Sequence, residues 1–122
     1  MDKNTLTVLV PVFNEQESII PLLTKLRNQE IPNLKVVVIN DGSIDKTRDL
    51  LEKNSDLWDE CIHFGENKGK GHAIKTGLSY VSSEYVLIQD ADLEYDPEEI
   101  PRLWGVVSKY HVDLLMTSRL NG

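Results

Sequence analysis

The feature that most constrains the fold is an apolar run that ends abruptly in acidic residues. Residues 85–88 (YVLI) are four consecutive apolar residues, which is typical of a strand buried on both faces of a parallel sheet. Asp90, Asp92 and Glu94 follow almost at once. Ligands of open α/β sheets bind in the crevice beyond the carboxyl ends of the strands. We therefore expect these acids at a ligand site.

The spacing of Asp90 and Asp92 indicates the kind of ligand. Side chains alternate along an extended segment, so residues two apart point to the same side. Two carboxylates that converge on one point repel each other unless a cation neutralises them, and Mg²⁺ or Mn²⁺ prefers such oxygen ligands. The pattern predicts a divalent metal site. The alternative is that one aspartate caps the next helix and the other faces water.

The rest of the chain alternates strands with helices. Apolar and β-branched runs predict strands at residues 6–13, 35–39, 61–64 and 113–117, and Pro11 is expected to mark the end of the first. Such alternation favours a doubly wound α/β fold, with a mainly parallel sheet, right-handed crossovers and helices on both faces. At 122 residues the chain is expected to form one domain.

The helices between these strands are predicted from caps and from apolar spacing. Ser18, Asp45 and Asp96 are the expected caps. The first helix has apolar residues at i, i+3, i+4 and i+7 and is expected to end before residue 31. The inner faces are predicted to consist of these residues: Ile19, Leu22, Leu23 and Leu26; Leu50 and Leu51; Ile74, Gly77, Leu78 and Val81; Ile100, Leu103, Trp104 and Val107.

Polar residues follow the carboxyl ends of the predicted strands, and parallel strands bring these ends to one edge of the sheet. We expect one crevice to collect Asn14, Glu15, Asp41, Asp90, Asp92 and Arg119. The loop at residues 65–71 (GENKGKG) precedes a helix and contains Lys68 and Lys70. Such a loop could offer backbone N–H groups and lysine charge to a phosphate, although it matches neither common phosphate-loop pattern. A plain connector is the alternative interpretation.

The composition indicates which binding partners and which cellular compartment are expected. There are 20 Asp and Glu residues against 13 Lys and Arg, a formal net charge of −7, which disfavours nucleic acid. The single cysteine, Cys61, excludes an internal disulfide framework and fits a reducing compartment. The apolar run at residues 6–13 is too short to span a membrane and lacks a basic leader. We expect a soluble, cytoplasmic chain.

Four motifs together resemble family 2 glycosyltransferases with the GT-A fold. They are PVFNE at residues 11–15, NDGSIDKT at 40–47, NKGKGHA at 67–73 and DADLEYDPEEIP at 90–101, and they match in order and spacing. Ser118 and Arg119 also resemble the serine-arginine pair of the branch that uses polyprenyl-phosphate acceptors. The motifs span nearly the whole chain, and the resemblance implies that residues 1–122 are the nucleotide-sugar-binding part of such a domain.

The resemblance implies a role for each site residue. Asp41 would contact the nucleoside, and Pro11, Phe13 and Glu15 would line its pocket. Asp90 and Asp92 would hold Mg²⁺ or Mn²⁺ on the diphosphate, and Asp92 is the residue expected to be catalytic. The full set of expected donor-binding residues is Pro11, Phe13, Glu15, Asp41, Lys70, Asp90 and Arg119. Glu94 is the third expected metal ligand, because dolichyl-phosphate mannose synthases tend to carry a metal-binding glutamine there.

The resemblance also implies a reaction. A sugar would pass with inversion from a UDP- or GDP-linked donor to an acceptor, a polyprenyl phosphate in one branch, in glycan or cell-envelope biosynthesis. Family members normally continue well beyond this point, so the 122 residues alone are expected to bind the donor and transfer poorly. A longer protein would act at the cytoplasmic face of a membrane. The alternatives are a non-catalytic binding domain or a phospho-acceptor signalling domain of the same fold. A phospho-acceptor domain has an acid pair after its first strand and a lysine after its last, and this sequence matches neither.

Overall fold

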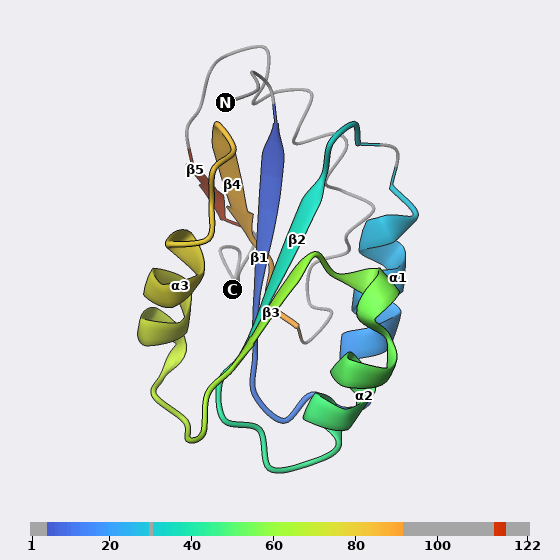
Figure 1. Ribbon diagram of the computed structural model, residues 1–122, viewed down its shortest axis with the longest axis vertical. Helices are drawn as coiled ribbons and strands as arrows, with labels where there is room; N and C mark the ends of the chain where they lie inside the picture. The colour runs from blue at the N-terminus through green and yellow to red at the C-terminus, as the bar shows by residue number, and fades with distance from the viewer. Residues whose placement is uncertain (1–4, 30, 92–113, 117–122) are drawn as a thin grey trace.

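Parallel strands form the centre of the molecule (Figure 1). The computed structural model describes residues 5–29, 31–91 and 114–116. Within these residues one five-stranded sheet has the order β3-β2-β1-β4-β5, and every neighbouring pair is parallel. The strands are β1 (Leu6–Val12), β2 (Lys35–Asn40), β3 (Glu60–His63), β4 (Tyr85–Ile88) and β5 (Leu114–Met116). The predicted parallel α/β sheet is confirmed.

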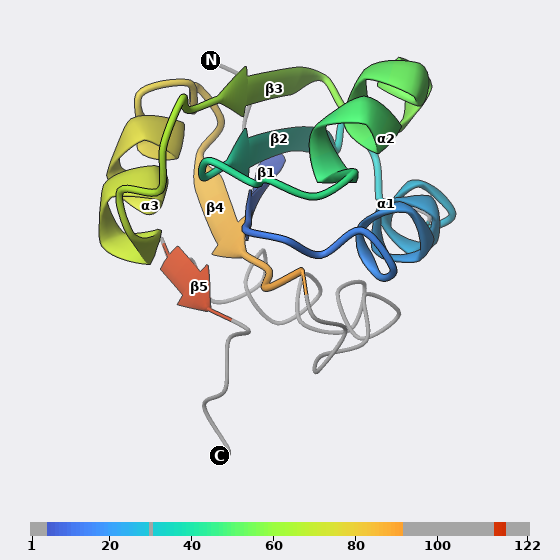
Figure 2. The same ribbon diagram turned by 90° about the horizontal axis from the view of Figure 1, so that it is seen from below.

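Helices cover both faces of this sheet (Figure 2). The helices α1 (Ile19–Arg27) and α2 (Thr47–Lys53) lie on one face, and α3 (Lys70–Leu78) lies on the other. A short 3₁₀ turn, η1 (Ser55–Leu57), follows α2. The chain winds from β1 outward to β3 and then returns to the other side of β1, and crossovers of constant hand place the returning helix on the opposite face. No helix in the described residues is long and apolar enough to cross a membrane.

Side-chain alternation along the strands produces two cores. Val8 and Val10 of β1 face α1, whereas Leu9 faces α3. The α1 residues predicted to be buried are all buried: Ile19, Leu22, Leu23 and Leu26. Strand β4 is buried along its whole length, as expected of a strand covered on both faces.

The prediction for the inner face of α3 was partly wrong. Gly77 is buried, and a Cβ there would lie 2.7 Å from Ile39 Cδ1, so the helix approaches the sheet closely at this point. Leu78, however, is 44% exposed. Val81 lies beyond the helix end but, like Ile74, packs against the core on this face as expected. Ala73, which was not predicted, is buried on the same face. Small residues on this face let the helix sit close to the sheet, and apolar spacing alone gives small residues little weight.

The predicted helix starts differ in how they are capped. Ser18 stands at the N-cap of α1, but its hydroxyl does not cap the helix. The N-cap of α2 is Lys46 rather than the predicted Asp45, although the Asp45 carboxylate, one residue earlier, accepts the N–H of Thr47 at 2.9 Å. Partial burial raises the pKa of Asp45, but hydrogen bonds from Thr47 and the Gln16 N–H outweigh this, so the net pKa is lowered. The predicted helix capped by Asp96 lies outside the described residues.

Pro11 does not end β1 as expected, but it ends one of its two ladders. Pairing with β2 continues to Val12, opposite Asn40, whereas pairing with β4 stops at Leu9, opposite Ile88. The Leu9 carbonyl, which accepts the N–H of Gln89 at 2.9 Å, faces β4. Backbone groups two residues apart face the same neighbour, so the nitrogen of Pro11 also faces β4 and has no hydrogen to donate. The two central strands therefore stop pairing at their carboxyl ends.

Candidate functional site

A cavity of about 580 Å³ opens where β1 and β4 stop pairing. This is the point where the strand order reverses direction, which is where open α/β sheets bind ligands. Its volume lies within the range of small-molecule sites. It is lined by Pro11, Val12, Phe13, Glu15, Asp41, Asn67, Gly69, Lys70, Asp90 and Ala91.

Six of the predicted site residues line this one cavity. They are Pro11, Phe13, Glu15, Asp41, Lys70 and Asp90. The other three, Asp92, Glu94 and Arg119, lie outside the described residues. The parallel sheet brings the six together because their segments all leave it at its carboxyl edge or reach back to that edge from α3.

Asp41 is the most heavily hydrogen-bonded of these residues. It is 4% exposed. One carboxylate oxygen accepts the N–H of Lys68 at 2.7 Å, and the other accepts the N–H of Gly69 at 3.0 Å and the side-chain amide of Asn67 at 3.2 Å. Asp41 thus ties the loop before α3 to the tip of β2.

Gly42 brings the same two segments into direct contact. Its φ is +73°, and a Cβ there would lie 2.2 Å from the carbonyl carbon of Glu66 and 2.3 Å from the nitrogen of Asn67. Only glycine allows this backbone approach without a shift of the chain. The loop is therefore built onto the end of β2, and the interpretation of residues 65–71 as a plain connector does not describe it.

This anchoring changes what the loop can offer a ligand. The N–H groups of Lys68 and Gly69 were candidates for phosphate binding, but both already donate to Asp41. The loop instead places Lys70, the first residue of α3, at the cavity. The lysine charge, rather than the loop amides, is what the described structure presents there.

Lys70 and Asp90 form an ion pair inside the cavity. The Asp90 side chain is 13% exposed and the Lys70 side chain 47% exposed. A carboxylate this poorly hydrated needs a cation or hydrogen bonds to remain charged, and here the ammonium group supplies the positive charge. Asp90 is thus held at the position where the sequence predicted a metal ligand.

Glu15 joins the cavity to the start of α1. The Ser18 hydroxyl lies 2.9 Å from Glu15 Oε2 and 2.7 Å from the Ala91 carbonyl oxygen. Both partners are acceptors, so the single hydroxyl proton is shared between them. Ser18, which sequence reasoning assigned to capping, instead bridges the segments that follow β1 and β4.

Asn14 does not line the cavity, contrary to expectation. Its φ is +52°, and its side-chain oxygen accepts the N–H of Ile44 at 2.8 Å and that of Asp45 at 3.4 Å. Its own N–H donates to Ser43 Oγ at 2.9 Å. Asn14 therefore holds the loop after β2 against the loop after β1. This tolerance of a left-handed backbone is characteristic of asparagine.

The described part of the cavity supplies one side chain that is suited to a divalent cation. Asp90 offers hard carboxylate oxygens, and it already requires a positive charge beside it. Among the residues that the structure describes, no group of three His, Cys, Asp or Glu side chains could hold a metal. The two other expected ligands, Asp92 and Glu94, are not among them.

Sequence reasoning did not single out four residues that line the cavity: Val12, Asn67, Gly69 and Ala91. Asn67 and Gly69 belong to a motif that was recognised, but their role depends on contact with Asp41, 26 and 28 residues away. Only the position of the loop in space reveals that contact. Val12 and Ala91 adjoin predicted site residues and follow from where the strands end.

A second polar cluster lies at the tips of β2 and β3. Asn40 Nδ2 lies 3.0 Å from His63 Nδ1, and Cys61 Sγ lies 3.6 Å from His63 Nε2. Burial, assisted by the charge of Arg48, lowers the pKa of His63. Burial raises the pKa of Cys61 to about 12, so this thiol stays protonated and is a poor nucleophile.

The fold and the cavity define the class of this protein. A doubly wound parallel sheet with a cavity at its switch point is the architecture of α/β domains that bind ligands beyond the carboxyl ends of their strands. Residues 7–121 match the profile of the family described as Glycosyl transferase family 2. The chain belongs to this family, as its motifs predicted.

Two curated relatives are similar to nearly the whole of this chain. The chain is 36% identical over 121 residues to the undecaprenyl-phosphate 4-deoxy-4-formamido-L-arabinose transferase of Serratia proteamaculans, covering 94% of this chain and 37% of that protein. It is 33% identical over 124 residues to the protein of the same name from Proteus mirabilis, covering 97% of this chain and 38% of that protein. The chain thus spans less than two fifths of the length of these relatives.

Solved structures share the fold. The crystal structure of S. aureus TarS 1-349 in complex with UDP aligns with a TM-score of 0.76 at 27% identity, covering 88% of this chain and 33% of that chain. The mannosyltransferase PcManGT from Pyrobaculum calidifontis, in complex with GDP-Man and Mn²⁺, aligns with a TM-score of 0.70 at 33% identity, covering 84% and 31%. Both are similar to this chain across its strands and helices, which confirms the predicted fold class.

Proposed function

We propose that residues 1–122 are the donor-binding part of an inverting, metal-dependent glycosyltransferase. The donor is a UDP- or GDP-linked sugar, and the acceptor is a polyprenyl phosphate. The acceptor assignment is supported by the curated relatives, which are named undecaprenyl-phosphate transferases. The donor assignment is supported by similar structures that contain UDP or GDP-Man. We propose that the transfer takes place at the cytoplasmic face of a membrane.

The observation that carries this proposal is the meeting of Asp41, Lys70 and Asp90 in one cavity at the switch point. Glu15 adds a third carboxylate to the lining. A cavity with three carboxylates and a single lysine among its described residues repels a diphosphate unless a cation accompanies it. A metal-bound nucleotide therefore fits the charge of this cavity, whereas a free one does not.

Asp90 would hold the divalent cation, together with Asp92 and Glu94 by resemblance. When bound, Mg²⁺ or Mn²⁺ would neutralise the charge that develops on the departing nucleoside diphosphate. Asp90 is ready for this role because it is already held close to a cation. Asp92 is the residue we assign to catalysis, because the family resemblance implies that it holds the metal at the departing diphosphate.

Asp41 can contact the nucleoside even though it anchors the loop. A carboxylate has about four acceptor positions, and the loop uses three of them. The oxygen bonded to Lys68 retains one position, which could accept an N–H of the base. Pro11 and Phe13 form the apolar wall of the same cavity, and Phe13 is 44% exposed and so available to a flat ring.

The reaction needs no strong general base when the acceptor is a lipid phosphate. Such an acceptor is already anionic and can attack the anomeric carbon directly, on the face opposite the leaving group. The nucleophile forms one bond as the bond to the diphosphate oxygen breaks, which inverts the configuration. Arg119 would contribute positive charge near the diphosphate by its family position.

Calorimetric titration of UDP, GDP and their sugar conjugates, with and without Mn²⁺, tests the donor site. We expect one nucleotide to bind only in the presence of Mn²⁺. Asp90→Asn should weaken this binding at least tenfold, because it removes the ligand charge without changing the shape of the side chain. Asp56→Asn is the matched control, since Asp56 is exposed and lies in η1, away from the cavity lining. Metal-independent binding, or equal binding by both variants, would contradict the proposed site.

A transfer assay tests whether residues 1–122 are sufficient for catalysis. We expect the 122 residues to bind donor and to transfer sugar poorly or not at all, because they span less than two fifths of the curated relatives. Robust turnover with a polyprenyl phosphate by this chain alone would refute that expectation.

A further inference from the structure

We infer that Lys70 is an internal counter-ion, which occupies the cation position at Asp90 until a divalent metal arrives and then pairs with the donor diphosphate. The inference rests on the proposed function and adds a mechanism that couples metal binding to nucleotide binding. It begins from the ion pair between these two side chains in the cavity.

Charge explains why this pair must separate when metal binds. Asp90 is 13% exposed, so little water screens its surroundings. A divalent ion on the carboxylate would stand within a few ångströms of the Lys70 ammonium if that group remained in place. Like charges at such distances repel more strongly in a poorly hydrated site than in water. Metal and ammonium therefore compete for the same carboxylate.

Lys70 is built so that it can leave. Its side chain is 47% exposed, and its four-carbon stem gives the ammonium a wide reach. Its backbone position is fixed by contrast, because Gly69 donates to Asp41 and Gly69 accepts the N–H of Ala73 at 3.1 Å within α3. Because the backbone of Lys70 is fixed, its ammonium group remains within reach of the cavity when it is displaced from Asp90.

The displaced ammonium has a natural partner in the donor. The described lining otherwise contains the carboxylates of Glu15 and Asp41, and Asp41 is occupied by the loop. A diphosphate beside the metal would supply new negative charge within reach of Lys70. Metal binding frees the lysine for the nucleotide, and nucleotide binding removes the lysine that competes with metal. The two ligands should thus bind cooperatively, by the same factor in each direction.

Lys70→Met tests this coupling, with Mn²⁺ binding measured by the electron paramagnetic resonance signal of free Mn²⁺. In the unaltered chain, saturating nucleotide should raise Mn²⁺ affinity about tenfold or more, a typical coupling. Lys70→Met should raise the affinity for Mn²⁺ alone about tenfold and lower nucleotide affinity in saturating Mn²⁺ by a similar factor. Changes of opposite sign are the signature of a counter-ion that transfers between two partners.

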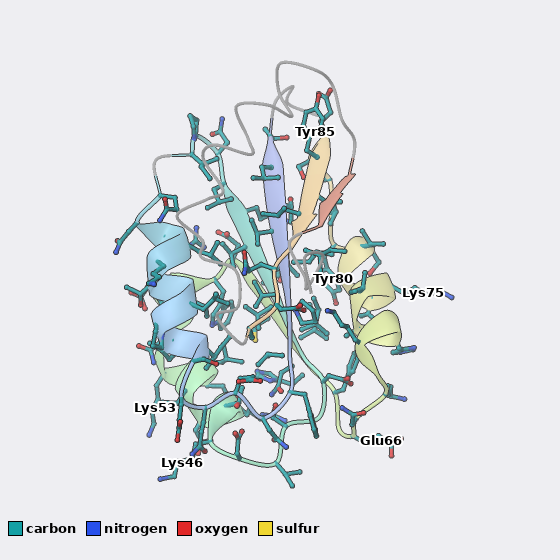
Figure 3. All side chains as sticks on the ribbon, turned by 180° about the vertical axis from the view of Figure 1, so that it is seen from behind. Lys46, Lys53, Glu66, Lys75, Tyr80 and Tyr85 are labelled. Carbon is teal, nitrogen blue, oxygen red and sulfur yellow. The ribbon has the colours of Figure 1, made fainter. Side chains whose placement is uncertain are left out.

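Two further variants control for charge and for folding. Lys75→Met removes the same charge from the same helix, and Figure 3 shows Lys75 pointing away from the sheet. It should leave both affinities unchanged. Lys70→Arg keeps a cation at the cavity and should restore weak binding of Mn²⁺ alone. Circular dichroism of each variant shows that the fold is retained.

The outcomes separate this inference from the proposed function. If the unaltered chain binds nucleotide with Mn²⁺ but Lys70→Met binds Mn²⁺ alone no more tightly, the inference is wrong and the proposed function stands. If Mn²⁺ binding strengthens while nucleotide binding is unchanged, Lys70 competes with metal but does not transfer to the donor, and the inference is again wrong. If neither chain binds Mn²⁺ or nucleotide, both proposals fail.

Discussion

Replacing Asp41 with alanine should release the loop before α3. The change removes the acceptor for the N–H groups of Lys68 and Gly69 and for the amide of Asn67. A hydrogen bond to a charged group contributes about 1.5–3 kcal/mol, but the exposed loop can regain water on opening. We therefore expect a loss of about 2–4 kcal/mol in the free energy of unfolding rather than the full sum. For a domain of 122 residues that is a large part of about 6–18 kcal/mol.

Urea denaturation measures the global loss, and amide hydrogen exchange locates it. The Lys68 and Gly69 amides should exchange faster in Asp41→Ala. The protection of the β1 amides should fall by no more than the loss in global stability. Asp41→Asn retains one acceptor oxygen and should lose about half as much. Asp56→Ala controls for the loss of a negative charge, because Asp56 is exposed. A loss below about 0.5 kcal/mol in Asp41→Ala, with unchanged exchange at Lys68 and Gly69, would refute the anchoring role.

Two further predictions concern backbone strain and pH. Gly42→Ala should lower the free energy of unfolding in urea by about 3 kcal/mol, because the φ of residue 42 is +73° and a Cβ there would lie 2.2 Å from the Glu66 carbonyl carbon. Gly71→Ala is the control, because a Cβ there meets no atom within 4 Å and the change should be neutral or stabilising. Equal losses of stability in the two variants would contradict the close approach at Gly42. Burial lowers the pKa of His63 below 6.5, so the unfolded chain takes up the proton first and stability should fall as pH drops through about 6.5. His63→Gln should flatten this dependence, and an unchanged slope would show that His63 is not its source.

The order of strands and helices could be predicted from the sequence because it depends on local pattern. Tyr85–Ile88 is a strand with the predicted bounds, and α1 buries the four residues that its spacing indicated. The errors lie where packing overrides the pattern. Leu78 was expected inside and is exposed, whereas Ala73 is buried, since α3 approaches the sheet through its small residues.

The residues of the candidate site were also predictable, but their partners were not. Polar residues at strand ends must share one edge of a parallel sheet, so Glu15, Asp41 and Asp90 were expected together, and all three line the cavity. Ser18 was expected to cap a helix, but it bridges Glu15 and Ala91, 73 residues away in sequence. Contacts over such separations leave no local signal.

Local sequence patterns were enough to predict the class of fold, the edge of the sheet where the site lies, and the family. These follow from hydrophobic periodicity, from turn residues and from motifs, all of which act over short stretches of chain. No local pattern indicated that Asp41 anchors a loop or that Lys70 neutralises Asp90; both contacts became visible in the folded chain. Whether a buried carboxylate meets an N–H group, an ammonium or a metal depends on which segments the fold brings within a few ångströms of it.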